Sequence, residues 1–357
     1  MNITIVGGGN VGTQFAVHCA EKGHNVTIFT SKPNAFSNEL FIVDEENTVL
    51  RRGEARATND AAIFSEADLI FVTTPSFMAE QVAEQIIPRV RSGTLIGFIP
   101  GTGGMECVFR SAVERGCILF GLQRVPSVAR LKEYGRTVCA VGYRDKLHVS
   151  AIPFQATERC RIIVEDLLSM PCAALPCYLN LTLTPSNPIL HTTRLRTLFK
   201  DYHKEKIYSR VPLFYEEWDN ESAERVFACD DEVQQLCKSL SEYDLSAVKS
   251  LKEHYESNTP DTLTQKIRSI VSFRGILTPM VTVDGGYVPD FNSRYFTADF
   301  PYGLAILRQI SAYLGVKTPA MDDVYGWYED VIGDHKKFNY RDYSIIDKSS
   351  FINFYSK

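Results

Sequence analysis

The first twelve residues constrain the fold of this chain most strongly, because a short apolar segment runs directly into a glycine-rich turn. Residues 3–6 predict a buried strand, and Gly7, Gly9 and Gly12 fit the pattern G-x-G-x-x-G. In this pattern the glycines allow a tight turn, close approach of a pyrophosphate and close packing of helix on strand. The turn therefore predicts the diphosphate-binding site of a dinucleotide.

The residues that follow supply the context that a lone glycine pattern lacks. Asn10 and Val11, which we expect to contact the cofactor, open a segment with an apolar stripe at helical spacing. Gly23 ends this segment, and residues 25–30 predict a second strand. This completes a first β-α-β unit at the expected spacing. The N–H groups and the dipole at the start of its helix are suited to hold the diphosphate.

The end of the second strand bears on the choice of cofactor. An acidic residue there would bind the adenosine ribose 2′-hydroxyl and repel a 2′-phosphate. This chain has Thr30, Ser31 and Lys32 instead, two hydroxyls and a cation without a carboxylate. The segment favours NADP(H) as the cofactor, although NAD(H) stays possible. The alternative interpretation is a solvated loop in which Lys32 does not contact the cofactor.

The strand and helix order continues as a mostly parallel sheet. Strands are predicted at residues 68–73, 94–99 and 118–121, and helices at 78–90, from 105 to about 115, and 157–168. Residues 38–58 interrupt this order as a β-hairpin insertion, and residues 137–142 and 147–152 resemble a closing hairpin.

Loops that follow parallel strands meet at one edge of the sheet, where ligands bind. We therefore expect Thr74, Pro75, Gly101 and Thr102 to line the same crevice as the first glycine turn. Three glycines within residues 101–104 further indicate that something closely approaches the backbone there.

The pattern changes near residue 178. Most later segments are predicted helices, including residues 188–200, 222–240, 244–257 and 301–314. The sequence thus predicts an α/β Rossmann-type domain over residues 1–177 and an all-α domain with substrate-binding and catalytic residues over residues 178–357, a division that suits a length of 357 residues.

Composition excludes several classes of function. With 43 acidic and 38 basic residues, the chain has no cationic excess for nucleic acid or anionic membranes. No apolar run approaches the roughly 20 residues that span a bilayer, and the first strand starts at Met1, so we expect a cytoplasmic protein. Nine scattered cysteines form no C-x-x-C pair, which predicts neither a zinc site nor a disulfide framework. A homodimer is possible from the sequence.

Two constellations in the second half carry candidate chemistry. Ser186 or Asn187 is a plausible N-cap of a helix in which His191 lies about one turn from the start. His191 alone is more often a packing residue than a catalyst. Asp299 follows a segment containing Arg294, and it could simply cap the next helix.

Together these motifs resemble the opine dehydrogenase family, also called the octopine/nopaline dehydrogenase family. The resemblance covers most of the chain and lies in residues 7–12, 100–106, 187–191, 273–275, 294–299 and 315–319. The most diagnostic elements are Asn-x-x-x-His at residues 187–191 and Arg-Tyr-Phe-x-x-Asp at residues 294–299.

This resemblance implies NAD(P)H-dependent reductive condensation of an amino acid with an α-keto acid, giving a secondary amine dicarboxylate. By position, His191 would be the general acid/base, Asp299 its orienting partner and Arg294 a carboxylate clamp. Gln123 and Arg130 would contribute substrate contacts, although family members often carry a glutamate where Gln123 stands.

Two alternatives remain from the sequence. The first is a two-domain reductase of a simple 2-keto acid, of the ketopantoate type, which typically places a lysine near the nicotinamide; no lysine occurs between Pro171 and Phe199. The second is a sensor that binds NADP without turnover, in which His191 and Asp299 would be unpaired or remote from the nicotinamide.

Overall fold

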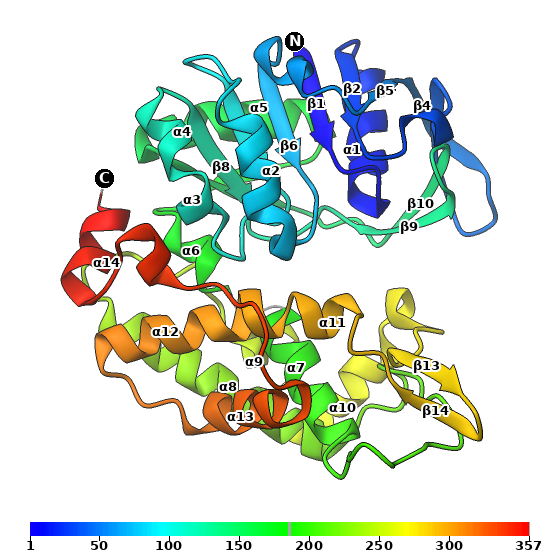
Figure 1. The fold of residues 1–357 in the computed structure, drawn as a ribbon, viewed down its shortest axis with the longest axis vertical. Helices are drawn as coiled ribbons and strands as arrows, with labels where there is room; N and C mark the ends of the chain where they lie inside the picture. Colours follow the sequence, from blue (N-terminus) through cyan, green and yellow to red (C-terminus); the bar gives the residue numbers. More distant parts are fainter. Residues whose placement is uncertain (185–186, 357) are drawn as a thin grey trace. The chain divides into compact units, whose positions relative to one another are not determined.

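The computed structural model describes residues 1–184 and 187–356, which form two compact units. The first unit comprises Met1–Thr182 with the last residues from Tyr355 onward, and the second comprises Leu183–Phe354 (Figure 1). The predicted fold class, a mostly parallel Rossmann-type domain followed by a helical one, is confirmed. The Ser186 N-cap prediction lies outside the described residues.

An eight-stranded sheet forms the centre of the first unit, in the order β12-β11-β8-β7-β6-β1-β2-β5. All neighbouring pairs are parallel except β11 with β8. The strands are β1 (Asn2–Val6), β2 (Asn25–Phe29), β5 (Arg56–Thr58), β6 (Leu69–Val72), β7 (Leu95–Phe98), β8 (Ile118–Leu122), β11 (Leu147–Ile152) and β12 (Cys172–Ala174).

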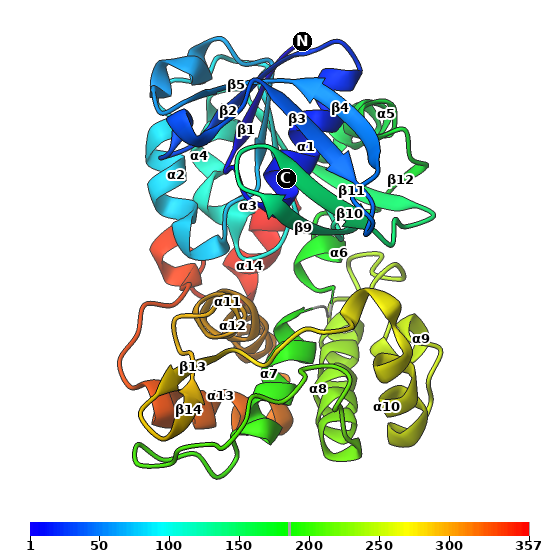
Figure 2. The same ribbon diagram turned by 90° about the vertical axis from the view of Figure 1, so that its right-hand side faces the viewer.

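Helices cover both faces of this sheet, with α2 and α4 on one face and α1 and α5 on the other (Figure 2). Strands β6 and β7 are buried along their whole length, as expected for central strands covered on both faces. The helices of this unit are α1 (Asn10–Glu21), α2 (Ala79–Ile86), α3 (Met105–Val108), α4 (Arg110–Glu114), α5 (Thr157–Leu168) and α6 (Leu179–Thr182).

A second sheet packs on α1, in the order β4-β3-β10-β9. It consists of β3 (Glu39–Val43), β4 (Val49–Glu54), β9 (Val128–Glu133) and β10 (Thr137–Val141). The predicted hairpin insertion is present as β3 and β4, which pair antiparallel. Because sheets lie on both sides of α1, its residues from Gly12 to Cys19 are all buried.

The predicted closing hairpin is wrong. Strand β10 pairs with β9 and β3 in the small sheet, whereas β11 pairs with β8 and β12 in the large one. Nearly every residue of β11 is buried, which suits a strand inside a covered sheet. Apolar residues near a turn predict two strands, but they do not specify the partner of each strand.

The second unit is helical apart from one hairpin, β13 (Met280–Val283) with β14 (Gly286–Pro289). The long helix α8 contacts α7, α10, α12 and α13. The helices are α7 (Asn187–Leu198), α8 (Asn220–Ser239), α9 (Leu251–His254), α10 (Pro260–Ser269), α11 (Arg294–Thr297), α12 (Ala305–Leu314), α13 (Pro319–Ile332) and α14 (Lys348–Tyr355).

The predicted helix over residues 244–257 is also wrong, since only Leu251–His254 is helical. The Asp244 carboxylate accepts from the backbone N–H of Ser246, and the Ser250 hydroxyl accepts from that of Glu253. Aspartate and serine side chains compete with the helix for backbone donors in this way. The segment consequently forms turns and one short capped helix.

Candidate active site

The glycine turn has the features of a diphosphate site. Gly7 has a φ of +101°, and a Cβ built on Gly12 would lie 1.8 Å from the Gly7 carbonyl oxygen. A Cβ on Gly9 would meet nothing within 4 Å, which leaves this side of the turn open. No side chain caps α1 at Gly9, so the N–H groups at this helix start lack the usual side-chain acceptor.

The other predicted cofactor residues lie along the same edge of the large sheet. Thr30 follows β2, Thr74 and Pro75 follow β6, and Gly101 and Thr102 follow β7, at the carboxyl ends of parallel strands. The Thr74 hydroxyl is buried without a hydrogen-bond partner among the described residues. This orphaned group and the open turn fit a bound dinucleotide.

Three of the predicted contacts have other partners in this unit. The Asn10 side-chain oxygen accepts from the backbone N–H of Leu131, which ties α1 to β9. The Thr30 hydroxyl accepts from the backbone N–H of Lys32. At Gly101 the group that approaches closely is the protein's own backbone, because a Cβ there would lie 2.8 Å from Cα of Gly121.

Gln123 and Arg130 are placed on different sheets. Gln123 follows β8 at the edge of the large sheet and is buried, and its amide donates to the carbonyl of Asn180. Arg130 lies exposed on β9 of the small sheet. A substrate contact by Gln123 and one by Arg130 therefore each stay a prediction.

His191 and Asp299 lie together in the second unit. The Nδ1 atom of His191 is 2.8 Å from a carboxylate oxygen of Asp299. Asp299 precedes a π-helical turn, Phe300–Leu304, and makes no side-chain cap there. Gly303 in this turn allows its approach to α7, because a Cβ there would lie 2.6 Å from Pro188.

Aromatic rings fix the orientation of His191. Tyr295 stacks on the imidazole with ring centroids 4.1 Å apart, and Phe214 meets it edge-on at 5.7 Å. The Tyr215 hydroxyl lies 2.7 Å from Nε2 of His191. Because the chain holds both ring nitrogens, the imidazole is set in one plane and one position.

Sequence reasoning missed Tyr215, and it named Tyr295 only as part of a motif. Residues 213–218 are rich in aromatic side chains but belong to no regular element and match no spacing rule. Arg294 is exposed on α11, directly before the stacked Tyr295. Its guanidinium makes no ion pair within the described part of the chain.

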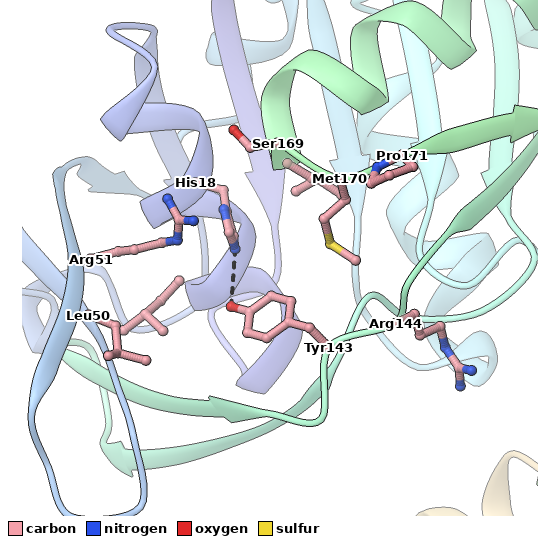
Figure 3. Close-up of a pocket in the computed structure, with 10 residues that line it drawn as sticks. His18, Leu50, Arg51, Tyr143, Arg144, Ser169, Met170 and Pro171 are labelled. Atoms are coloured by element: carbon pink, nitrogen blue, oxygen red, sulfur yellow. Dashed lines mark hydrogen bonds between the residues drawn. The ribbon is translucent and has the colours of Figure 1, made fainter.

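A separate pocket of about 430 Å³ lies in the first unit and contains none of the predicted site residues (Figure 3). Its wall includes His18, whose Nε2 is 3.3 Å from the Tyr143 hydroxyl. Burial, with Arg51 and Lys22 nearby, lowers the pKa of His18 to about 4. His18 is therefore neutral at neutral pH.

Comparison with known proteins shows which families the two halves of the chain resemble. Residues 174–332 match the model described as "NAD/NADP octopine/nopaline dehydrogenase, alpha-helical domain", and residues 3–148 match that of the ketopantoate reductase family PanE/ApbA. The helical half of the chain is thus similar to octopine/nopaline dehydrogenases, and the first half is similar to ketopantoate reductases. The protein is accordingly an NAD(P)-dependent oxidoreductase.

Relatives named octopine or opine dehydrogenase align over most of the chain. Octopine dehydrogenase of Mizuhopecten yessoensis is 26% identical, covering 93% of this chain and 90% of its own length. Opine dehydrogenase of Haliotis discus hannai is 28% identical over 75% of this chain and 70% of its own. A structure of octopine dehydrogenase with NADH and L-arginine aligns with a TM-score of 0.79 and 25% identity, covering 92% and 89% of the two chains.

Among the described residues, no helix is long and apolar enough to cross a membrane. Nor do the described residues contain a group of histidine, cysteine or acidic side chains arranged to hold a metal ion.

Proposed function

We propose that this protein is an opine dehydrogenase, which joins the α-amino group of an amino acid to the carbonyl carbon of an α-keto acid and reduces the resulting imine. The observation that carries the proposal is the His191–Asp299 pair on the helical unit, at 2.8 Å. Sequence similarity supports it, because relatives named octopine, tauropine and opine dehydrogenase align with the chain.

The contacts of His191 and Asp299 support the roles that we propose for them. The Asp299 carboxylate accepts from Nδ1–H of His191, which fixes the tautomer and leaves Nε2 for proton exchange. His191 would take the protons that the amino nitrogen loses and pass them to the carbonyl oxygen, which leaves as water. After taking one proton from solvent, it would protonate the nitrogen of the imine. Arg294 is suited to bind a substrate carboxylate through two parallel hydrogen bonds.

The first unit would hold the cofactor. The open side of Gly9 and the N–H groups at the start of α1 would bind the diphosphate, with the orphaned Thr74 hydroxyl at the next strand end. When bound, the nicotinamide supplies the hydride, and the protein supplies orientation and charge. A cytoplasmic location belongs to the same proposal, and a homodimer stays a prediction.

We further propose a preference for NADP(H), supported by the exposed Ser31 and Lys32 after β2. Changing Lys32→Asp should lower the ratio of kcat/KM for NADPH to that for NADH about tenfold, because a cation near the 2′-phosphate becomes an anion. Steady-state kinetics with both cofactors measure this ratio. Lys22→Asp, at the far end of α1, is the matched control. An unchanged ratio in Lys32→Asp would contradict the proposed role of Lys32 in cofactor preference.

The function itself is tested by following NADPH oxidation over a matrix of amino acids and α-keto acids, with each keto acid also supplied alone. We expect oxidation that requires both substrates. Oxidation with a keto acid alone would indicate a simple ketone reductase instead. His191→Ala should bind NADPH normally and lose about a hundredfold or more in kcat; near-normal kcat in folded variant would contradict the role of His191.

A further inference from the structure

The proton-exchanging nitrogen of His191 already has a partner within the chain. A neutral imidazole has one N–H donor and one acceptor nitrogen. Because Nδ1–H donates to Asp299, Nε2 is the acceptor, and the Tyr215 hydroxyl donates to it at 2.7 Å. A substrate atom could take this nitrogen only if the hydroxyl moved away.

The ring of Tyr215 is held in a way that opposes such a movement. It stacks on Phe273 with centroids 4.1 Å apart at 20°, and Phe214 packs edge-on at 4.9 Å. The residue is 4% exposed. To swing the hydroxyl off Nε2, the whole aromatic cluster would have to rearrange, which a close-packed interior disfavours.

The backbone of Tyr215 is also tied to the helix that carries His191. Arg194 lies three residues further along α7 and is buried. Its guanidinium donates to the carbonyls of Phe214 and Glu217, at 3.2 and 2.6 Å, and to the carboxylate of Asp219 at 2.7 Å. One helix therefore fixes both the imidazole and the segment that presents the hydroxyl.

We propose that Tyr215 is a catalytic residue whose hydroxyl carries protons between His191 and the substrate. In the reducing direction Nε2–H of protonated His191 passes its proton to the Tyr215 oxygen. In the same step the original hydroxyl proton moves to the carbonyl oxygen or imine nitrogen. One N–H and one O–H bond break, one O–H bond forms on Tyr215 and one new bond to hydrogen forms on the substrate.

Tyr215 ends this step as it began, as a neutral phenol. The surroundings of Tyr215 favour moving both protons in one step. Burial, followed by the charge and the hydrogen bond of Tyr295, raises the pKa of Tyr215 well above the usual value. A separate tyrosinate would therefore be costly. The proposal rests on the proposed function, since it requires that His191 exchange protons with a substrate.

Tyr215→Phe tests the proposal, because phenylalanine keeps the stacked ring and removes only the hydroxyl. We expect kcat with the active substrate pair to fall about a hundredfold, the scale of acid–base catalysis, while the Kd for NADPH and the thermal midpoint change little. The matched control is Tyr325→Phe. The Tyr325 hydroxyl lies 3.0 Å from Nε2 of His335 in the same unit, and its loss should leave kcat unchanged.

Two kinetic results would overturn the proposal. A kcat for Tyr215→Phe within threefold of the wild type would show that the hydroxyl carries no proton. A lower KM with an undiminished kcat would show that substrate simply displaces it.

A second readout separates this proposal from the function on which it rests. Nitrogen-15 spectra of the histidine rings, with His191→Ala to assign the signals, report the bond at Nε2 without turnover. We expect the Nε2 signal of His191 to shift in Tyr215→Phe and not in Tyr325→Phe. If the wild type binds NADPH but condenses no substrate pair, the proposed function fails; an unmoved Nε2 signal overturns the Tyr215 proposal by itself.

Discussion

Single residues in the glycine turn serve different physical purposes. Gly12 allows α1 to pack on the turn, because its Cβ would lie 1.8 Å from the Gly7 oxygen. Gly8, which the sequence pattern leaves unspecified, accommodates the ring of Phe36, whose Cζ would lie 2.2 Å from an added Cβ. Gly9 alone faces open space. Among the glycines of this turn, only Gly9 is not required by the packing of the protein itself.

This difference predicts opposite outcomes for two alanine substitutions. Gly9→Ala should leave the free energy of unfolding within about 0.5 kcal/mol, since φ is −86° there, and should weaken NADPH binding about tenfold or more by filling the diphosphate position. Gly12→Ala should destabilise the protein by about 3 kcal/mol through overpacking. Urea unfolding and fluorescence titration with NADPH check both. A destabilised Gly9→Ala with normal NADPH affinity would contradict this assignment.

At the site, the sequence could foresee residues that belong to motifs. The motifs at residues 187–191 and 294–299 pointed to His191 and Asp299. The structure brings these two side chains into contact. Tyr215 could not be foreseen, because its position depends on Arg194 reaching the carbonyls of Phe214 and Glu217. Such side-chain bonds to an irregular backbone leave no periodic pattern in the sequence.

At the scale of elements, one carboxylate joins two helices of the second unit. Glu232 on α8 is buried and accepts from the backbone N–H groups of Ala320 and Met321, at 2.6 and 2.9 Å. These donors belong to the first turn of α13, where helical N–H groups lack partners. Glu232 thus caps a helix that lies far from it in the sequence.

Replacing Glu232→Gln should lower the free energy of unfolding by about 2 kcal/mol. The amide NH2 replaces one of the two acceptor oxygens and faces a backbone N–H donor, and the charge at the helix start is lost. Urea unfolding at neutral pH measures the loss. Glu224→Gln, at an exposed position of the same helix, should change stability by less than about 0.5 kcal/mol. Equal losses in both variants would refute the capping role.

The strand and helix order of the first unit was largely predictable, because buried parallel strands and glycine stops have strong local signals. Strand partners were less accessible: β10 and β11 are neighbours in sequence but lie in different sheets. The helix predicted over residues 244–257 does not form for a local reason, since the side chains of Asp244 and Ser250 accept hydrogen bonds from backbone N–H groups. Hairpin β13–β14 was also missed within an otherwise helical region.

At the scale of the whole molecule, His18 links stability to pH. Burial, then Arg51 and Lys22, lowers its pKa from 6.5 to about 4 in the folded state. The unfolded chain therefore binds more protons between these values, and stability falls as the pH falls through this window. Since a tenfold change in proton affinity is worth about 1.4 kcal/mol, the full effect is about 3 kcal/mol.

His18→Gln removes this ionisation, so acid should destabilise the variant less than the wild type. The difference in unfolding free energy between the two proteins should shrink by about 3 kcal/mol on acidification from neutral pH to pH 4. Urea unfolding over a pH series measures it, and comparing two proteins cancels the other ionising groups. A constant difference across the series would show that His18 does not titrate in this way.

The pairing of both nitrogens of His191 also affects how the protein meets foreign chemicals. A metal ion or an acylating reagent needs an unshared electron pair on the ring, and the only such pair accepts the hydroxyl proton of Tyr215. The exposed ring of His203, whose carboxylate partner Glu205 is also exposed, offers an easier target. Traces of zinc ions or of an electrophile would therefore react with His203 at the surface before they react with His191. The proposed catalytic activity would be retained.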